Sequence, residues 1–260
     1  MSSAGPDRAV VVTGAASGIG RATAELFADR GFGVVAVDVA EAALDWTKGY
    51  EAVEPLVGDV STAATNEAMV AIATSRFGRL DVAVLNAGVV GSPPIEADGA
   101  IERFDQVMAI NVRGVVLGIR YAAPALRDAG GGAIVATAST SGIRADPGSW
   151  AYNASKAAVI NLVRAAAIDY ATQGIRVNAV APGPTATGMT NPLQDRAPGV
   201  WSSIESRVPM QRFGEPSELA EAIFFLASPA ASFITGVTLP VDGGISANAG
   251  HFPPVPRTTT

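Results

Sequence analysis

The sequence predicts an α/β fold, a doubly wound parallel seven-stranded sheet with helices on both faces, in a single domain over residues 1–260. Short, almost continuously apolar segments alternate with segments of helical spacing, which is typical of a parallel sheet covered on both faces. Most of the glycine-rich and polar stretches follow the apolar segments, where such sheets bind ligands. No shift in composition divides the chain, and its length suits one large domain.

The first part of the chain predicts three strands and two helices. Residues 8–14 are a β-branched run that stops at a glycine, as a strand would. Residues 20–31 space their apolar side chains three and four apart and end at a glycine, which predicts a helix. Residues 33–38 are apolar almost throughout and predict a buried strand. We expect a third strand at 53–59 and a helix behind it at 62–77.

The middle of the chain continues this alternation. Residues 80–88 and 131–139 are apolar runs that end in small or polar residues, which predicts two strands. Between them, 101–129 is a long helical stretch that we expect to be broken near Asn111. Residues 150–173 predict another long helix.

The last part of the chain supplies the remaining elements and a long connection. We expect strands at 175–183 and 234–244, with a helix at 216–227 between them. Residues 184–214 contain four prolines and predict a loop near the substrate. The proline-rich tail 246–260 is predicted to be flexible.

Charge and rare residues exclude several classes of function. The net charge is −6 and Lys and Arg form no cluster, so we expect no nucleic-acid partner. No apolar run reaches the ~18 residues of a membrane span, and the N-terminus lacks the pattern of a secretion signal. The absence of cysteine and the single His251 argue against thiolate chemistry, a zinc site and Ser-His-Asp hydrolysis. We therefore expect a cytoplasmic protein that holds no metal.

The stretch "TGAASGIG" (13–20) joins the first predicted strand to the first helix. Gly14, Gly18 and Gly20 remove Cβ atoms where a backbone turns sharply or approaches a ligand. Free N–H groups at the start of a helix suit a pyrophosphate. The spacing differs from the common dinucleotide fingerprint, so a glycine-rich turn without a ligand remains the alternative.

Asp38 ends the second predicted strand, 18 residues after Gly20. A carboxylate at this place accepts both hydroxyls of an adenosine ribose and repels a 2′-phosphate. The next residue is Val39, and Ser17 is not basic either, so neither position offers a positive charge to a 2′-phosphate. The sequence therefore favours NAD(H) over NADP(H). The alternative is a carboxylate that only forms a turn at a strand end.

Lys156 is one of two lysines in the chain and follows Tyr152 by four residues. In a helix these two positions share one face. A free tyrosine has a pKa of about 10, and a nearby cation lowers that pKa by favouring the phenolate. We expect Tyr152 to be a general acid/base assisted by Lys156. A surface lysine beside a half-buried tyrosine is the alternative.

Ser139 lies 13 residues before Tyr152, at the end of the fifth predicted strand. Its hydroxyl could donate to a carbonyl oxygen and hold that oxygen beside the phenol. Thr140 and Ser141 are local rivals for this role.

Together these pieces resemble the short-chain dehydrogenase/reductase family in its single-domain form, over roughly residues 7–245. The matching segments are "TGAASGIG", Asp59-Val60, "NAG" at 86–88, Asn111, Ser139, "YNASK" at 152–156, Pro182-Gly183 and Thr187. The resemblance implies a Rossmann-type, doubly wound sheet of seven strands and a homo-oligomer, a tetramer or a dimer. It also implies hydride transfer between a nicotinamide and a secondary alcohol or ketone, a small-molecule substrate.

The resemblance also implies roles for single residues. Tyr152 would be the acid/base, Lys156 would lower its pKa and bind the nicotinamide ribose, and Ser139 would polarise the substrate oxygen. Asn111 would hold a water molecule in a proton relay linked to Lys156. The cofactor-binding residues implied are Gly14, Ser17, Gly18, Ile19, Gly20, Asp38, Asp59, Val60, Asn86, Ala87, Gly88, Tyr152, Lys156, Pro182, Gly183, Thr185 and Thr187.

The substrate pocket is the least specified part of the site. Candidate pocket residues are Ser141, Ile143, Trp150, Met189 and Trp201. The apolar side chains of the 184–214 segment predict either a lid over a hydrophobic or cyclic substrate or a simple anchor to the core. In the same segment Arg196, Arg207 and Arg212 either bind an anionic group or are solvated.

Three functions remain in view. The first is an NAD(H)-dependent dehydrogenase or ketone reductase for a small or cyclic secondary alcohol. The second is a 3-oxoacyl-thioester reductase of the acyl-carrier-protein type, which usually uses NADPH and is disfavoured by Asp38. The third is a non-catalytic NAD-binding sensor, which would not need Tyr152, Lys156, Ser139 and Asn111 together.

Overall fold

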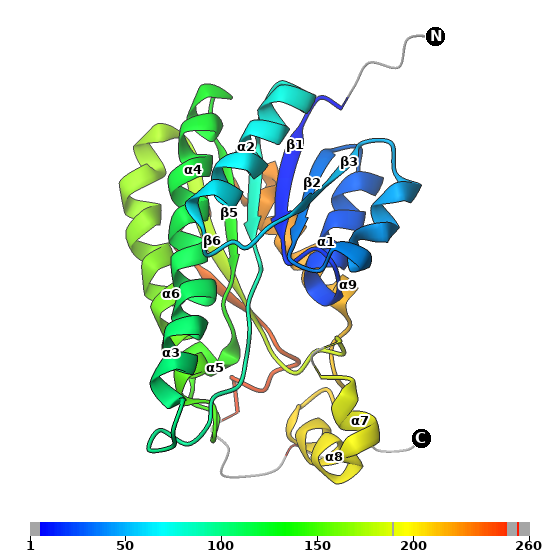
Figure 1. Cartoon of the computed structure of the whole chain (residues 1–260), viewed down its shortest axis with the longest axis vertical. Helices are drawn as coiled ribbons and strands as arrows, with labels where there is room; N and C mark the ends of the chain where they lie inside the picture. Colours follow the sequence, from blue (N-terminus) through cyan, green and yellow to red (C-terminus); the bar gives the residue numbers. More distant parts are fainter. Residues whose placement is uncertain (1–5, 189, 249–253, 255–260) are drawn as a thin grey trace.

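A computed structural model describes residues 6–188, 190–248 and 254 of the chain. Within these residues seven strands form one sheet in the order β3-β2-β1-β4-β5-β6-β7, and each neighbouring pair is parallel (Figure 1). The strands are β1 (Ala9–Thr13), β2 (Gly33–Asp38), β3 (Val53–Val57), β4 (Val82–Leu85), β5 (Gly132–Thr137), β6 (Ile175–Pro182) and β7 (Thr238–Val241). The predicted doubly wound, seven-stranded sheet is confirmed.

Helices cover both faces of this sheet (Figure 1). The helices are α1 (Gly18–Asp29), α2 (Ala63–Phe77), α3 (Ala100–Met108), α4 (Gly114–Asp128), α5 (Thr140–Ile143), α6 (Trp150–Tyr170), α7 (Pro192–Arg196), α8 (Pro198–Arg207) and α9 (Pro216–Ala227). Helices α2, α4 and α6 pack on one face, and α1 and α9 pack together on the other. No helix in the described part of the chain is long and apolar enough to cross a membrane.

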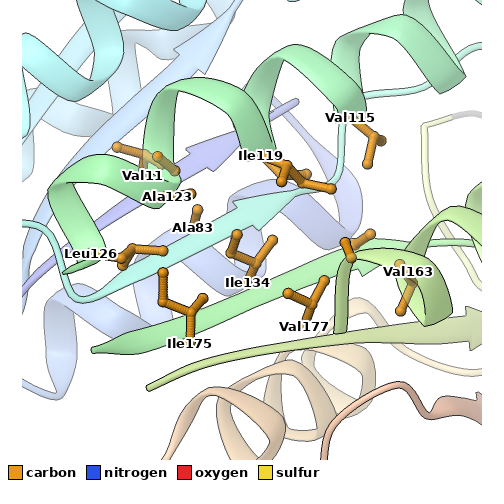
Figure 2. Packing of buried hydrophobic residues seen from close by; sticks show 14 of the residues in the cluster. Val11, Ala83, Val115, Ile119, Ala123, Leu126, Ile134, Val163, Ile175 and Val177 are labelled. Carbon is orange, nitrogen blue, oxygen red and sulfur yellow. The ribbon is translucent and has the colours of Figure 1, made fainter. Parts of the chain in front are cut away.

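The core lies between the sheet and these helices because the strands are apolar on both faces. Ile134 and Val177 point from β5 and β6 towards Ile119 of α4 and Val163 of α6 (Figure 2). Each of these four side chains is almost completely buried. Burying an aliphatic side chain of this size stabilises the fold by about 1.5–3 kcal/mol. This packing fixes the positions of the strand ends relative to one another.

The sheet order creates a crevice between two strand ends. Strand β1 pairs with β2 on one side and with β4 on the other. The chain therefore leaves β1 in one direction along the sheet and returns at β4 to continue in the other. Ligands bind at the carboxyl ends of the strands where the order reverses in this way. The turn after β1 and the segment after β4 both face that crevice.

Two helical segments depart from the simplest prediction. The stretch expected to break near Asn111 does so, because residues Ala109–Arg113 form a π-helical turn between α3 and α4. Residues 184–214, predicted to be a loop, contain α7 and α8. Pro198 stands at the first turn of α8, where a helix tolerates proline because no intrahelical N–H bond is lost. The segment is thus more ordered than its prolines suggested.

The predicted flexible tail lies mostly outside the described residues. Residues 246–248 are described, and Arg144 donates hydrogen bonds to the carbonyl oxygens of Ser246 and Asn248. Asp242 accepts a hydrogen bond from the N–H of Ser246. The start of the tail is therefore attached to the loop after α5.

Candidate active site

A cavity of about 740 Å³ opens at the carboxyl ends of the strands. Most residues selected from the sequence line it: Gly14, Ser17, Gly18, Ile19, Asp38, Asn86, Ala87, Gly88, Ser139, Ser141, Tyr152, Lys156, Pro182, Gly183, Thr185 and Thr187. Seven selected residues lie outside its lining: Gly20, Asp59, Val60, Asn111, Ile143, Trp150 and Trp201. Met189 lies outside the described residues.

The glycines of the turn after β1 permit close contacts. A Cβ at Gly20 would lie 2.0 Å from the carbonyl oxygen of Gly14, so helix α1 can start against the turn only with glycine there. Gly14 has φ +70°, and a Cβ on it would lie 2.9 Å from the Asn86 side chain. Gly18 has φ +54°, and a Cβ there would lie 3.2 Å from Thr187. Gly20 thus shapes the turn without lining the cavity.

The start of α1 fits a phosphate group. Ser17 is the residue before the helix, and its side chain makes no capping hydrogen bond. The first N–H groups of α1 therefore lack a side-chain acceptor, and they carry the positive end of the helix dipole. Ser17, Gly18 and Ile19 all line the cavity. A dinucleotide whose pyrophosphate meets these groups fits the residues present.

Asp38 holds the turn and keeps acceptor capacity for a ligand. Its Oδ2 accepts from the N–H of Ala16 at 3.0 Å, and its Oδ1 accepts from the N–H of Ala40 at 3.1 Å. Each carboxylate oxygen can accept a further hydrogen bond. The adjacent Val39 is 67% exposed, so an apolar side chain stands beside the carboxylate.

Thr13, the first residue of the glycine-rich stretch, joins the turn to the end of β4, a role that the sequence analysis did not assign. Its Oγ1 accepts from the N–H groups of Asn86 at 2.9 Å and Ala87 at 3.0 Å. The Asn86 side chain donates to the Thr13 carbonyl at 3.1 Å and accepts from the Thr137 hydroxyl at 3.0 Å. Three strand ends are thereby tied together beneath the cavity. Threonine is common within strands, so its position in the sequence gave no indication of these hydrogen bonds.

Tyr152 and Lys156 share one face of α6, as the sequence predicted. The Lys156 Nζ lies 5.6 Å from the centroid of the Tyr152 ring and donates to the Thr137 carbonyl at 2.7 Å. Lys156 is only 3% exposed. Burial disfavours the charged ammonium and lowers the pKa of Lys156 to about 8.

The expected effect of Lys156 on Tyr152 is absent from this arrangement. Burial raises the pKa of Tyr152, the Ser139 hydroxyl lowers it in part, and the Asp146 carboxylate raises it further. Desolvation of the phenolate therefore outweighs the attraction of a cation whose Nζ is directed to Thr137. In the protein alone, Tyr152 is a protonated acid.

Ser139 belongs to a chain of hydroxyl groups that ends on a carboxylate. The Ser139 Oγ donates to the Ser141 Oγ at 3.1 Å, and the Ser141 Oγ donates to Asp146. The Ser139 Oγ also accepts from the N–H of Ser141 at 3.1 Å. Because Asp146 takes the Ser141 proton, Ser141 can only accept from Ser139. The Ser139 hydroxyl can instead turn towards Tyr152, whose pKa it lowers, or towards a bound ligand, and Asp146 is a cavity residue that the sequence did not single out.

Asn111 connects the cavity wall to α6. Its Oδ1 accepts from the N–H of Val89 at 2.8 Å, and its Nδ2 donates to the Val89 carbonyl at 2.9 Å and to the Ser155 Oγ at 3.0 Å. It is fully buried. The Asn111 amide thus fixes the segment after β4 against α6. The water relay expected from its family position stays a prediction, since both amide hydrogens already have protein acceptors.

Comparison with known proteins identifies the family. A family model described as enoyl-(acyl carrier protein) reductase matches residues 14–246. The cis-4-hydroxycyclohexanecarboxylate dehydrogenase of Sinomonas cyclohexanicum is 45% identical over 254 residues, which cover 95% of this chain and 100% of that protein. The crystal structure of levodione reductase matches with a TM-score of 0.86 and 37% identity, covering 94% of this chain and 99% of that chain. The 3-ketoacyl-(acyl-carrier-protein) reductase from Brucella melitensis, solved with NADH, matches with a TM-score of 0.85 and 36% identity, covering 92% of this chain and 98% of that chain.

The chain belongs to the short-chain dehydrogenase/reductase family. As a member of it, the protein is an oxidoreductase that interconverts a secondary alcohol and a ketone with a nicotinamide cofactor. The resemblance stated from the sequence motifs is confirmed.

Two tryptophans selected for the pocket of this short-chain dehydrogenase/reductase have other partners. The Trp150 Nε1 donates to the Pro93 carbonyl at 2.9 Å, and its ring stacks on Phe104 at 5.6 Å between centroids. Trp201 stacks on Phe213 at 3.6 Å. Both anchor segments that border the cavity. Ile143 of α5 is 45% exposed and does not line the cavity.

The residues expected at the adenine lie in the turn before α2. The Asp59 Oδ1 accepts from the N–H of Ser61 at 2.8 Å. Val60 is buried, and its carbonyl accepts from the Asn66 side chain at 2.8 Å. The pair follows β3 at the same edge of the sheet as the cavity, beyond its lining. Their contact with the adenine stays a prediction.

The 184–214 segment of this short-chain dehydrogenase/reductase, called the lid below, has side chains that line the cavity and side chains that anchor it to the rest of the fold. Val200 and Ile204 of α8 line the cavity, while Phe213 lines it and is 5% exposed. Thr185 pairs with Gly214 as an isolated bridge. The anchoring that the sequence offered as one interpretation is present, and closure of the segment over a substrate stays a prediction. Further lining residues are Val90, Thr137, Ala138, Thr140, Asp146, Pro147, Pro184, Thr190, Arg207 and Ile245.

Proposed function

We propose that this protein is an NAD(H)-dependent dehydrogenase for a cyclic secondary alcohol, with Tyr152 as the general acid/base. One observation carries the proposal: a single cavity joins the phosphate-binding turn and Asp38 to Tyr152, Lys156 and Ser139. A relative with 45% identity is named for a hydroxylated cyclohexane ring. The apolar face of α8 over the same cavity suits such a ring.

In this proposal the protein's residues position the alcohol and move its proton. The nicotinamide, when bound, supplies the carbon that accepts or returns the hydride. The Ser139 hydroxyl, turned from Ser141 towards the substrate, would donate to the substrate oxygen and hold it beside Tyr152. The Tyr152 phenolate takes the hydroxyl proton in oxidation, and the phenol returns it in reduction. Since burial opposes the phenolate, a protonated Lys156 turned towards the phenol would favour it.

Asp38 supports NAD(H) as the cofactor. Both carboxylate oxygens keep free acceptor capacity, and the neighbouring Val39 offers no positive charge to a 2′-phosphate. The matched reductase from Brucella melitensis was solved with NADH. A carboxylate at this position would repel NADPH.

We further propose a single functional domain that assembles as a homotetramer or a homodimer in the cytoplasm. Ile168 and Phe233 are large apolar side chains with most of their surface exposed, which is typical of surfaces that another subunit covers. Burial between subunits would explain why large apolar side chains occupy these exposed positions.

No observation favours the thioester reductase over the alcohol dehydrogenase. Asp38 opposes the NADPH that such reductases usually use, although the matched reductase from Brucella melitensis was solved with NADH, and no basic patch is evident for a carrier protein. The sensor alternative is disfavoured because Ser139, Tyr152 and Lys156 meet in one cavity.

The cofactor proposal is tested by titrating the protein with NADH and NADPH while following nicotinamide fluorescence. NADH is expected to bind at least 10-fold more tightly than NADPH, since Asp38 would accept from two ribose hydroxyls of NADH and would repel the 2′-phosphate of NADPH. The Asp38→Ser variant should lose most of that preference, and Asp45→Ser, in the exposed 3₁₀ turn Glu41–Gly49, is the matched control. Tighter binding of NADPH by the unmodified protein would contradict the role of Asp38.

A further inference from the structure

We propose that Arg207 binds a carboxylate on the ring of the substrate, so that the protein selects anionic cyclic alcohols over neutral ones. This inference rests on the proposed function and names the substrate class of the same site. Arg207 lines the cavity and extends from the last turn of α8.

The structure separates the three arginines of the 184–214 segment. Arg212 forms an ion pair with Glu218 at 2.6 Å and a second hydrogen bond to the other oxygen of that carboxylate at 2.7 Å. Arg196 ends α7 and does not line the cavity. Arg207 lines the cavity and forms no ion pair with any residue that the structure describes. Its guanidinium therefore has its donors available for a ligand.

The position of Arg207 follows from the helical spacing of α8. Val200, Ile204 and Arg207 are separated by four and three residues, so they lie on one face of the helix. All three line the cavity. This face offers two aliphatic side chains followed by one cation, which matches a ring that carries an acidic group.

The backbone next to Arg207 is fixed. Val208 is 2% exposed, and a Cβ on Gly243 would lie 2.6 Å from its Cγ1, which shows how closely the two segments pack. The Met210 N–H donates to the Gly243 carbonyl at 3.2 Å. The end of α8 is thus held against the turn after β7, so the backbone of Arg207 has a fixed position relative to the cavity.

The other charges in the cavity orient such a substrate. Asp146 lies beside the Ser139–Ser141 pair and would repel a carboxylate at the reacting end. Asp38 would do the same at the end occupied by the ribose. Lys156 is buried and already donates to the Thr137 carbonyl. Arg207 is the cation of the cavity wall formed by the lid, so the hydroxyl is directed to Ser139 and Tyr152 and the carboxylate to α8.

The test compares 4-hydroxycyclohexanecarboxylate with 4-methylcyclohexanol, using NAD and the Arg207→Gln variant. Loss of a charge-assisted hydrogen bond should raise KM for the carboxylate about 10- to 100-fold. The kcat for it, and both constants for the neutral alcohol, should stay within about 2-fold, because the reacting groups are untouched. Arg207→Lys should restore part of the affinity, and Arg196→Gln is the matched control. Thermal unfolding of each variant shows whether loss of a cation from the last turn of α8 has changed stability.

A second measurement separates this inference from the proposed function. Cyclohexanecarboxylate cannot be oxidised at a hydroxyl, so its binding to the NAD complex, followed by calorimetry, reports the anion site alone. Weaker binding to Arg207→Gln supports the inference even if no alcohol is turned over, a result that would reject the proposed dehydrogenase. Turnover of both alcohols with an equal change, or with no change, in Arg207→Gln overturns the inference and leaves the dehydrogenase in place. Equal losses in Arg196→Gln, or no binding of cyclohexanecarboxylate to the unmodified protein, also overturn it.

Discussion

Burial decides the protonation of Tyr152 and Lys156, the two side chains to which we assign the proton transfer. Without a cofactor, desolvation lowers the pKa of Lys156 to about 8 and raises the pKa of Tyr152. Both shifts disfavour the charged forms, since neither group has an opposite charge beside it. Without a cofactor, both side chains are therefore closer to their uncharged forms than the sequence predicted.

The lowered pKa of Lys156 predicts how stability without cofactor changes with pH. Between pH 8 and pH 10 the folded protein has released the Lys156 proton, because its pKa is about 8, while the unfolded chain, with a pKa of 10.5, retains it. The unfolded state then binds more protons, so the free energy of unfolding should rise with pH by on the order of 2–3 kcal/mol over this range. Above pH 10 the raised pKa of Tyr152 acts in the opposite direction.

Urea unfolding at pH 8, 9 and 10 of the unmodified protein and of Lys156→Met measures this contribution. Subtracting the pH profile of Lys156→Met removes the effect of all other groups. If the two profiles run parallel, Lys156 titrates normally and the argument from burial is wrong.

Single residues also show which parts of the site the sequence could predict. Asp38 and Gly14 line the cavity as expected, because short local patterns place them at the ends of strands. Trp150 was selected for its closeness to Tyr152, but residues two apart on a helix do not share a face, and its indole is directed to Pro93. Asp146 was missed because only the folded loop brings its carboxylate to Ser141.

Among the elements, α5 and α6 set the geometry of the reacting groups. Gly142 in α5 touches the backbone of α6: a Cβ there would lie 2.6 Å from the carbonyl carbon of Lys156. The short helix carries Ser141 and follows Ser139, so its distance from α6 fixes the distance of both serines from Tyr152. Sequence analysis missed α5 because four residues are too few for a periodic pattern.

Gly142→Ala should therefore impair catalysis through the position of α5. The added methyl meets backbone and must displace the helix, which costs about 1–3 kcal/mol of stability, and kcat should fall because the serine hydroxyls move away from the phenol. Gly49→Ala is the control, since no atom lies within 4 Å of its Cβ position. Thermal unfolding and steady-state kinetics of both variants check this, and unchanged kcat in Gly142→Ala would show that α5 does not position the serines.

The lid shows why the second half of the sequence was harder to interpret. The prolines of 184–214 suggested a loop, but one of them, Pro198, begins a helix. The helix face that meets the cavity then follows from Val200, Ile204 and Arg207, whereas Trp201 lies beside that face and stacks on Phe213. Without the start of α8, the sequence alone could not assign these faces.

For the whole molecule, the sheet order explains why distant segments form one site. Strands β1, β4, β5 and β6 are neighbours in the sheet, and their carboxyl ends bring together the turn after Thr13, Asn86, Ser139 and Pro182. The alternation of strands and helices predicted this architecture, because parallel strands with crossover helices must end at the same edge. Contacts such as that between Thr13 and Asn86 depend on register, which no local pattern encodes.

The central claim is that the cavity oxidises a cyclic secondary alcohol with NAD through the phenol of Tyr152. The most direct measurement is NADH formation from 4-hydroxycyclohexanecarboxylate by the unmodified protein and by Tyr152→Phe, with NADH binding measured on both. Turnover by the unmodified protein, with kcat reduced about 10²- to 10⁴-fold in Tyr152→Phe and NADH binding unchanged, is the predicted result. Equal turnover by the two proteins would contradict the account, because the proton would then leave by a group other than Tyr152.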